Sequence, residues 1–158
     1  MPELNVGDPA PDFSLPKTPD GEFHLLDFKG KKNVIVSVHV LDFTGDDTRG
    51  CFCQIHTWRD NYQRIQAADG EVVEVSADSV FAHRRYLQDL GEVPFPLAAD
   101  FTKNMLRQYG ILNETNGFPV RSVFVIDKNG EVKYKNTSFN ASEPSQYEEA
   151  IKALEALK

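Results

Sequence analysis

The residues best suited to chemistry are two cysteines and the segment that surrounds them. Residues 41–60, LDFTGDDTRGCFCQIHTWRD, hold both cysteines of the chain, Cys51 and Cys53, with one phenylalanine between them. A thiolate is a nucleophile and a metal ligand, so the pair could form a disulfide, bind a metal, or supply one working thiol beside a bystander. Two cysteines are too few for a disulfide framework, and in a reducing compartment a close pair indicates chemistry rather than stapling.

Cys51 is expected in the first turn of a helix. Side chains recur at helical spacing from this point onward, at Cys51, Ile55, Trp58, Tyr62 and Ile65. Free backbone N–H groups and the positive end of the helix dipole favour a thiolate there. Thr48, three residues earlier, has a hydroxyl that either caps the helix or donates a hydrogen bond to the sulfur. Gly50 lets the backbone approach closely.

The role of Cys53 stays open between two alternatives. Side chains two residues apart in a helix point about 200° apart, so Cys53 should face away from Cys51. A disulfide between them, with Cys53 resolving an oxidised Cys51, would require the first helical turn to unwind. The other alternative is an inert Cys53, with an external thiol that recycles Cys51.

Metal binding is the third interpretation of the segment. Cys51, Cys53 and His56 form a C-x-C-x-x-H cluster, but on a continuous helix only Cys53 and His56 share a face. A closed zinc site needs four ligands, so we expect no metal. His39 lies within an apolar strand, where a hydrogen-bonded core histidine is expected.

The elements that would position these residues alternate between strands and helices. Strands are expected over 33–43, 71–77, 95–100, 121–127 and 131–136, and helices from 51, from 79 to 90, over 101–110 and over 142–158. Parallel units come first and a hairpin last, so we infer an α/β fold with a central mixed sheet and helices on both faces. Asp20-Gly21 signals an additional hairpin near the N-terminus. The length, 158 residues, fits one domain over 1–158.

Composition and charge exclude several classes of partner. Lys+Arg 17 against Asp+Glu 24 gives a net charge of -7, without a basic patch in the sequence. Such a chain would repel a phosphate backbone or an anionic membrane surface, so we expect neither nucleic acid nor membrane as a partner. The start, MPELNVGDPAPDF, has no basic and apolar export signal. We therefore expect a cytoplasmic location.

The order of segments resembles the peroxiredoxins, which are thiol peroxidases with a thioredoxin-like fold. The resemblance runs over roughly residues 4–136 and rests on VGDPAPDFSL, NVIVSV, the T-x-x-C of Thr48 to Cys51, EVVEVSADS, FPLAAD and RSVFVIDKNGEVKY. It implies that Cys51 is the peroxidatic cysteine and Thr48 its active-site threonine. It also implies that Arg121 meets the site from a neighbouring strand, and that Gln54 is the polar residue one turn into the helix.

The resemblance also implies the reaction and its partners. Peroxide would be the substrate, a thioredoxin-like protein or a small thiol the reductant, and no bound cofactor would be required. Family members often form dimers, which makes a homodimer an expectation. Two other functions are weighed beside this one: a thioredoxin-like thiol–disulfide oxidoreductase, which usually uses C-x-x-C rather than C-x-C, and a non-enzymatic peroxide sensor or scaffold.

The loop before Cys51 departs from the family pattern. The family has a proline seven residues before the cysteine, where this chain has Thr44. Aligned on the preceding strand instead, DFTG (42–45) matches, but Asp47 falls where the cysteine should be. The two alignments differ by four residues. The helix register, counted back from WRD, selects Cys51 and makes GDDTRG a longer loop.

Overall fold

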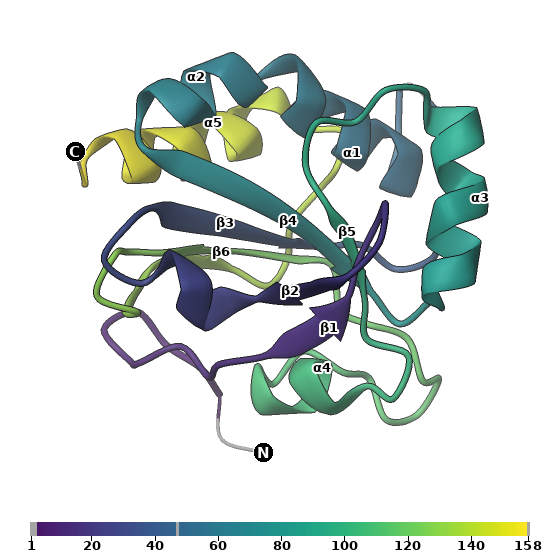
Figure 1. The fold of residues 1–158 in the computed structure, drawn as a ribbon, viewed down its shortest axis with the longest axis horizontal. Helices are drawn as coiled ribbons and strands as arrows, with labels where there is room; N and C mark the ends of the chain where they lie inside the picture. The colour runs from purple at the N-terminus through teal and green to yellow at the C-terminus, as the bar shows by residue number, and fades with distance from the viewer. Residues whose placement is uncertain (1–2, 47, 158) are drawn as a thin grey trace.

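A five-stranded mixed β-sheet forms the centre of the structure, a computed structural model that describes residues 3–46 and 48–157 (Figure 1). The strand order is β5-β4-β3-β6-β7. The strands are β3 (Asn33–Val38), β4 (Gly70–Ser76), β5 (Leu97–Ala99), β6 (Ser122–Ile126) and β7 (Val132–Asn136). β3, β4 and β5 run parallel, whereas β6 is antiparallel to β3 and to β7. β3 is buried along its whole length, as a strand rich in β-branched residues at the sheet centre should be.

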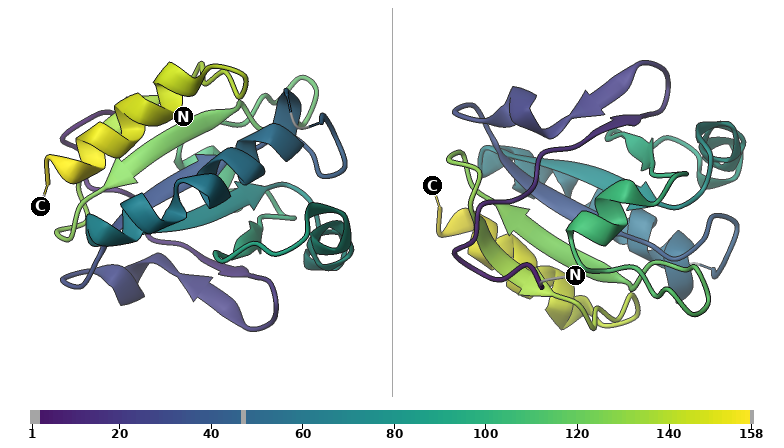
Figure 2. Two further views of the ribbon diagram at one scale, coloured as in Figure 1. Left: turned by 90° about the horizontal axis from the view of Figure 1, so that it is seen from above. Right: turned by 90° about the horizontal axis from the view of Figure 1, so that it is seen from below.

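Helices cover both faces of this sheet. They are α1 (Gly50–Asp60), α2 (Tyr62–Ala67), α3 (Val80–Leu90), α4 (Asn104–Gln108) and α5 (Pro144–Glu155). α1, α2 and α5 lie on one face, α4 lies on the other, and α3 stands beside β5 (Figure 1). The hairpin of β1 (Ser14–Pro16) and β2 (Glu22–His24), with a short 3-10 helix η1 (Leu25–Phe28), shares the face of α4 (Figure 2). The layers and the N-terminal hairpin that the sequence predicts are thus confirmed.

Several elements are shorter than the sequence predicts, among them β5 and α5, which lose residues at both ends of the predicted ranges. The helix expected to run on from Cys51 is interrupted at Asn61, so that α1 and α2 are separate. The strand expected over 33–43 ends at Val38, because the chain then turns and its next side chains bond to one another rather than extend the sheet. The helix expected over 101–110 is reduced to α4, since its first residues form a turn.

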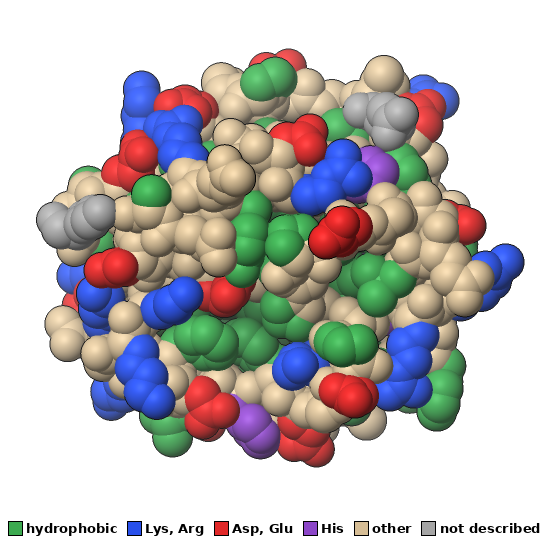
Figure 3. Space-filling view, turned by 45° about the horizontal axis from the view of Figure 1, so that its top comes forward, with side chains coloured by type: hydrophobic (Ala, Val, Ile, Leu, Met, Phe, Trp, Pro, Cys, Tyr) green, Lys and Arg blue, Asp and Glu red, His purple; other side chains and the backbone are tan. Residues whose placement is uncertain are grey.

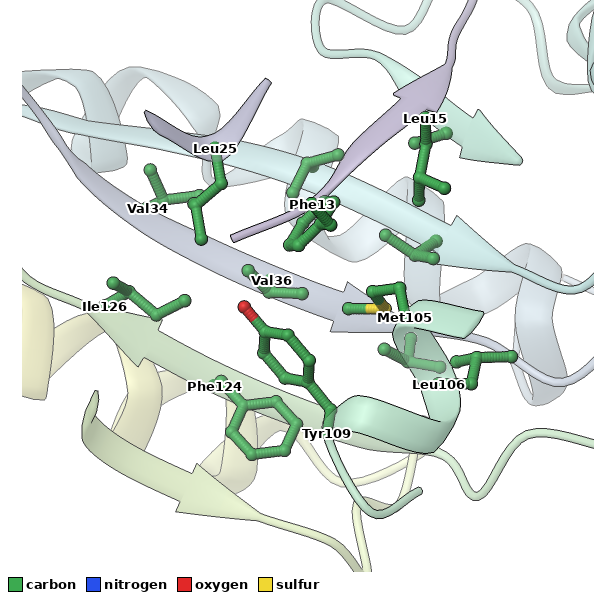
Figure 4. Close-up of a cluster of buried hydrophobic side chains, with 14 of the residues drawn as sticks. Phe13, Leu15, Leu25, Val34, Val36, Met105, Leu106, Tyr109, Phe124 and Ile126 are labelled. Atoms are coloured by element: carbon green, nitrogen blue, oxygen red, sulfur yellow. The ribbon is translucent and has the colours of Figure 1, made fainter. Parts of the chain in front are cut away.

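The sheet face below α4 and the hairpin carries an apolar core. Its buried side chains include Phe13, Leu15, Leu25, Val34, Val36, Met105, Leu106, Tyr109, Phe124 and Ile126 (Figure 4). Fully burying one such aliphatic or aromatic side chain contributes roughly 1.5–3 kcal/mol. This core holds α4 and the N-terminal hairpin against the sheet.

The face below α1 differs, because polar side chains interrupt its core. Successive side chains of a strand point to opposite faces, and the valines of β3 and β4 that alternate with Ser37, Glu74 and Ser76 belong to the other core. All three polar residues are fully buried. Ser37 and Glu74 are partners in the parallel register, and Ser37 accepts a hydrogen bond from Gln54 of α1. A buried polar band therefore lies beneath the start of α1.

The surface shows mixed charge. On the face drawn in Figure 3, Lys and Arg side chains are interspersed with Asp and Glu. Within residues 3–46 and 48–157, none of the helices is long and apolar enough to cross a membrane.

Candidate active site

Cys51 lies in the first turn of α1, and two donors approach its sulfur. The backbone N–H of Leu41 points at Sγ with an N–S distance of 3.5 Å, and Nη2 of Arg121 lies 3.4 Å from it. The Cys51 side chain is 0 % exposed. α1 carries no acidic residue in its first turn that would oppose a thiolate at the positive end of this helix.

Arg121 reaches the sulfur because of the strand register. It directly precedes β6, and Ser122 pairs with Val38 at the point where the chain leaves β3. Its Nη1 donates to Oε1 of Gln54 at 2.6 Å. Gln54 is itself held, because its Nε2 donates to Ser37 Oγ at 2.6 Å. The structure thus brings Arg121 and Gln54 to Cys51, the neighbours that the sequence assigned to it, while their catalytic roles stay predictions.

The loop before Cys51 is closed by two glycines in contact. Gly45 and Gly50 have φ values of 83° and 78°, a region that suits residues without a Cβ. A Cβ on Gly50 would lie 2.8 Å from the Cα of Gly45, and a Cβ on Gly45 would overlap the carbonyl oxygen of Arg49. Asp46 and Arg49 exchange backbone hydrogen bonds of 2.9 and 3.3 Å. The close backbone approach expected at Gly50 is confirmed.

Thr48 does not contact the sulfur, and the prediction that placed it there is wrong. Its hydroxyl donates to Oδ1 of Asp46 at 2.6 Å, and its side chain is exposed. It does not cap α1 either, since the residue in the cap position is Arg49. The hydroxyl that affects Cys51 belongs to Thr44: it donates to the carbonyl oxygen of Leu41 at 2.6 Å, and it helps to lower the pKa of the Cys51 thiol against the effect of burial.

The two alternative alignments are therefore both right, each for one residue. Thr44 fits the alignment from the preceding strand, and Cys51 fits the helix register, because the contact of Gly45 with Gly50 closes off the four positions that separate the two alignments. When the four additional positions are left out of the count, the position of the family's proline moves from Thr44 to Val40. Asp47, the alternative cysteine position, lies outside the described residues.

The charges around Cys51 favour its thiolate. Burial alone would raise the pKa of the Cys51 thiol, but the positive charges of His39 and Arg121 and the hydrogen bonds from Thr44 and Leu41 outweigh it and lower the pKa. Because the thiolate is the nucleophile, this balance supports the prediction that Cys51 is the reactive thiol.

His39 is a hydrogen-bonded core histidine, as predicted, but its partners escaped sequence reasoning. It is fully buried and contacts Glu74 and Asp42 at 2.6 Å each. Asp42 in turn contacts His83 of α3 at 2.6 Å. The signal that was available is the pair of charged residues, Glu74 and His39, in segments otherwise apolar enough to be central strands. Their pairing across 35 positions could not be read from spacing.

Cys53 has neutral surroundings. It is 8 % exposed, and its thiol donates to the carbonyl oxygen of Ala141 with an S–O distance of 3.3 Å. His56 turns elsewhere, with Nε2 2.7 Å from the carbonyl oxygen of Leu90. The metal cluster weighed for Cys51, Cys53 and His56 therefore does not assemble. Within the described residues, the ligand atoms that do gather within 4.8 Å of one another are those of His39, Asp42, Asp78 and His83.

Comparisons with known proteins agree with this geometry. Residues 6–135 match the model of the AhpC/TSA family. The chain is 33 % identical to the chloroplastic 2-Cys peroxiredoxin BAS1 of Hordeum vulgare, covering 97 % of this chain and 75 % of that protein. It is 34 % identical to the BAS1 protein of Spinacia oleracea, of whose length it spans 59 %.

A solved structure shows the fold independently. The crystal structure of the peroxidoxin BcpB from Mycobacterium tuberculosis superposes with a TM-score of 0.87 at 21 % identity, covering 99 % of both chains. The chain therefore belongs to the AhpC/TSA family and is a thiol-dependent peroxidase of the peroxiredoxin type with a thioredoxin-like fold.

Proposed function

We propose that Cys51 is the peroxidatic residue and that its thiolate attacks a hydroperoxide. An S–O bond forms as the O–O bond breaks, and the sulfur is oxidised by two electrons to a sulfenic acid. The second oxygen departs as hydroxide or alkoxide and takes up a proton to leave as water or an alcohol. The observation that carries this proposal is the contact of 3.4 Å between Arg121 Nη2 and Cys51 Sγ at the start of α1.

Arg121 and Thr44 are placed to stabilise the leaving oxygen. Arg121 is held by Gln54, so its guanidinium is aimed before substrate arrives. A preorganised donor aimed at developing negative charge contributes on the order of 3 kcal/mol. Thr44 donates its one hydroxyl proton to the Leu41 carbonyl at 2.6 Å, and its hydroxyl also helps to lower the pKa of the Cys51 thiol against the effect of burial. It can turn its proton toward whichever oxygen or sulfur is negative.

An external thiol fits the recycling step best. It would attack the sulfenic acid, release water and form a mixed disulfide, which a second thiol then reduces. Cys53 is poorly placed for this attack because its thiol is bonded to Ala141 on the other side of α1. A thioredoxin-like protein or a small thiol is the proposed donor, and a homodimer in the cytoplasm stays a prediction, as does a single domain over 1–158.

The competing function, thiol–disulfide exchange by the cysteine pair, has weaker support. Cys51 and Cys53 have separate hydrogen-bond partners, and a bond between them would break the first turn of α1. A scaffold without redox chemistry would not need Arg121 against the sulfur, whereas a sensor would react with peroxide but would not turn over with a thiol donor.

Consumption of hydrogen peroxide by the reduced protein tests the proposal. We expect one equivalent to be consumed rapidly without an added donor, and continued turnover with a thiol donor. Cys51→Ser should consume none, whereas Cys53→Ser, its matched control, should consume the first equivalent at the wild-type rate. A parallel insulin-reduction assay should remain negative. Disulfide reduction without peroxide consumption would replace the proposal by the oxidoreductase.

A further inference from the structure

Four buried ionisable side chains form a continuous hydrogen-bonded row beneath the start of α1. They are Glu74, His39, Asp42 and His83, in that order. His39 places Nδ1 2.6 Å from Glu74 Oε2 and Nε2 2.6 Å from Asp42 Oδ1. His83 places Nδ1 2.6 Å from Asp42 Oδ2 and Nε2 3.0 Å from the carbonyl oxygen of Ala98. The two histidines and Glu74 are 0 % exposed and Asp42 4 %. Buried charges need partners, so this set must be balanced internally.

Counting protons limits the charges that these four side chains can carry together. Each of the four contacts needs one proton between nitrogen and oxygen. Burial would raise the pKa of Asp42, but the hydrogen bonds from His39 and His83 lower it to about 2, so Asp42 supplies no proton. With Glu74 taken as a carboxylate, all four protons lie on imidazole nitrogens, in agreement with the raised pKa of His39, which its hydrogen bonds with Asp42 and Glu74 bring about against the effect of burial. Two cations then balance two carboxylates.

The same residues do not have the spacing of a metal site. Ligands of a tetrahedral zinc ion lie about 2.0–2.1 Å from the metal and therefore roughly 3.3 Å from one another. The contacts of Asp42 with the two histidines are 2.6 Å, the length of a charge-assisted hydrogen bond. Asp78, the fourth potential ligand, already accepts from the Asp42 N–H and the Ser76 hydroxyl through Oδ2.

The charge of His39 acts on Cys51, because together with Arg121 it lowers the pKa of the thiol against the effect of burial. His39 lies two residues before Leu41, and the backbone N–H of Leu41 points at the Cys51 sulfur. Burial alone would lower the pKa of His39, but its hydrogen bonds with Asp42 and Glu74 and the charge of Cys51 raise it well above its ordinary value. Other ionisable groups surround His39 and Cys51. They are Glu74 of β4, His83 and Tyr86 of α3, Asp42 after β3, Asp78 after β4, and Arg121 before β6.

We propose that Glu74 is a positioning residue of the peroxidase: its carboxylate keeps His39 doubly protonated, and this imidazolium stabilises the Cys51 thiolate. The inference rests on the proposed function of Cys51 and extends it to a residue that never meets the substrate. Oε1 of Glu74 is buried and has no hydrogen-bond partner among the described residues. A buried carboxylate oxygen without a partner requires an explanation, and stabilisation of a neighbouring cation supplies one.

Replacing Glu74 by glutamine changes the charge and little else. The amide of Gln can donate to His39 Nδ1, while Nε2–H of His39 donates to Asp42, so a neutral His39 is fully hydrogen-bonded in Glu74→Gln. This set of four side chains again has no net charge, because the positive charge of His83 balances the negative charge of Asp42. The cation beside Cys51 would be lost, and its thiolate would be less stable.

The test is a thiolate titration of Cys51 in the full chain. In a Cys53→Ser background, the rate of alkylation by iodoacetamide is measured from pH 4 to 9 without peroxide. We expect Glu74→Gln to move the inflection upward by on the order of one pH unit. Glu71→Gln is the matched control, because Glu71 lies on the same strand but bonds to Tyr62. Its inflection should match that of the parent.

A double variant separates a role through His39 from a direct one. In a His39→Gln background, adding Glu74→Gln should give no further upward shift, and this pair also keeps the test available if the single variant does not fold. An unchanged or lowered inflection in Glu74→Gln, or an additional upward shift in the double variant, overturns the proposal. Since no peroxide is used, failure of Cys51 as a peroxidase and failure of Glu74 as its positioning residue are distinguishable.

Discussion

Cys51 and Cys53 lie two residues apart on one helix, yet their surroundings have little in common. Cys51 meets a guanidinium, a backbone N–H and the field of a buried imidazolium. Cys53 meets the carbonyl oxygen of Ala141 and the hydroxyl of Thr57. A carbonyl accepts from a thiol and would repel a thiolate, whereas a guanidinium attracts one.

The contrast shows that the reactivity of these thiols is set by remote segments. Arg121 lies 70 positions from Cys51, and Ala141 lies 88 positions from Cys53. The helix contributes the same local conformation to both residues. What differs is which face of α1 each occupies, and therefore which part of the sheet it meets.

Removal of each thiol gives the largest expected difference. Cys51→Ser should abolish peroxide consumption, because a neutral hydroxyl cannot replace the thiolate. Cys53→Ser should retain the first turnover. Stopped-flow mixing with stoichiometric peroxide measures both. Equal losses in the two variants would erase the distinction between the cysteines.

Removal of the Arg121 guanidinium beside the Cys51 sulfur should have the next largest effect. We expect Arg121→Met to lower the second-order rate constant with peroxide by about 10²–10³-fold, the effect of losing one aimed donor. Arg107→Met removes the same charge at an exposed pair with Glu114 and should leave the rate unchanged. An unchanged rate in a folded Arg121→Met protein would show that the arginine serves only the fold.

Acid should lower the free energy of unfolding of the protein through protonation of Asp42. Its pKa is raised by burial but lowered more by His39 and His83, from 3.8 to about 2. The stabilisation is therefore present above its ordinary pKa and is lost as the pH falls through about 2, at a cost of about 2 kcal/mol in the free energy of unfolding. Urea titrations from pH 5 to pH 2 measure it. Asp42→Asn should be less stable at pH 5 and lose this part of the acid dependence; an unaltered pH profile would contradict it.

The smallest expected effect distinguishes two threonines. Thr44→Val removes the hydroxyl beside the sulfur and should slow the peroxide reaction about tenfold, in line with one hydrogen bond to a charged group. Thr48→Val, the matched control, alters an exposed contact with Asp46. The same stopped-flow assay compares them. A slower Thr48 variant with a normal Thr44 variant would restore the assignment made from spacing alone.

Sequence reasoning reached the parts of the site that depend on local pattern. The helical spacing after Cys51 identified the start of α1, and the resemblance to a family identified Arg121. The T-x-x-C spacing misled at Thr48, because an inserted turn is invisible to spacing when both of its ends stay in contact. Gly45 and Gly50 were the available signal, since two backbone segments that approach this closely require residues without a Cβ at both ends of the loop.

The buried charges were beyond the reach of pattern. The sequence indicated that His39 needs a hydrogen-bond partner, but not which one. Glu74 becomes its partner through the parallel pairing of β3 and β4, in which Ser37 and Glu74 are aligned. Asp42 and His83 meet because α3 packs beside the end of the sheet. Such contacts depend on register and packing, which single-sequence periodicity does not contain.

The most direct test of the central claim is the pH dependence of Cys51 alkylation in the reduced wild-type protein, followed by peptide mass spectrometry. Labelling of Cys53 in the same sample reports whether α1 has opened. We predict that Cys51 labelling is half-maximal at a pH below the value of about 8.5 for a free thiol, while Cys53 stays largely unlabelled. Half-maximal labelling of Cys51 at or above that value, with Cys53 protected, would contradict the account.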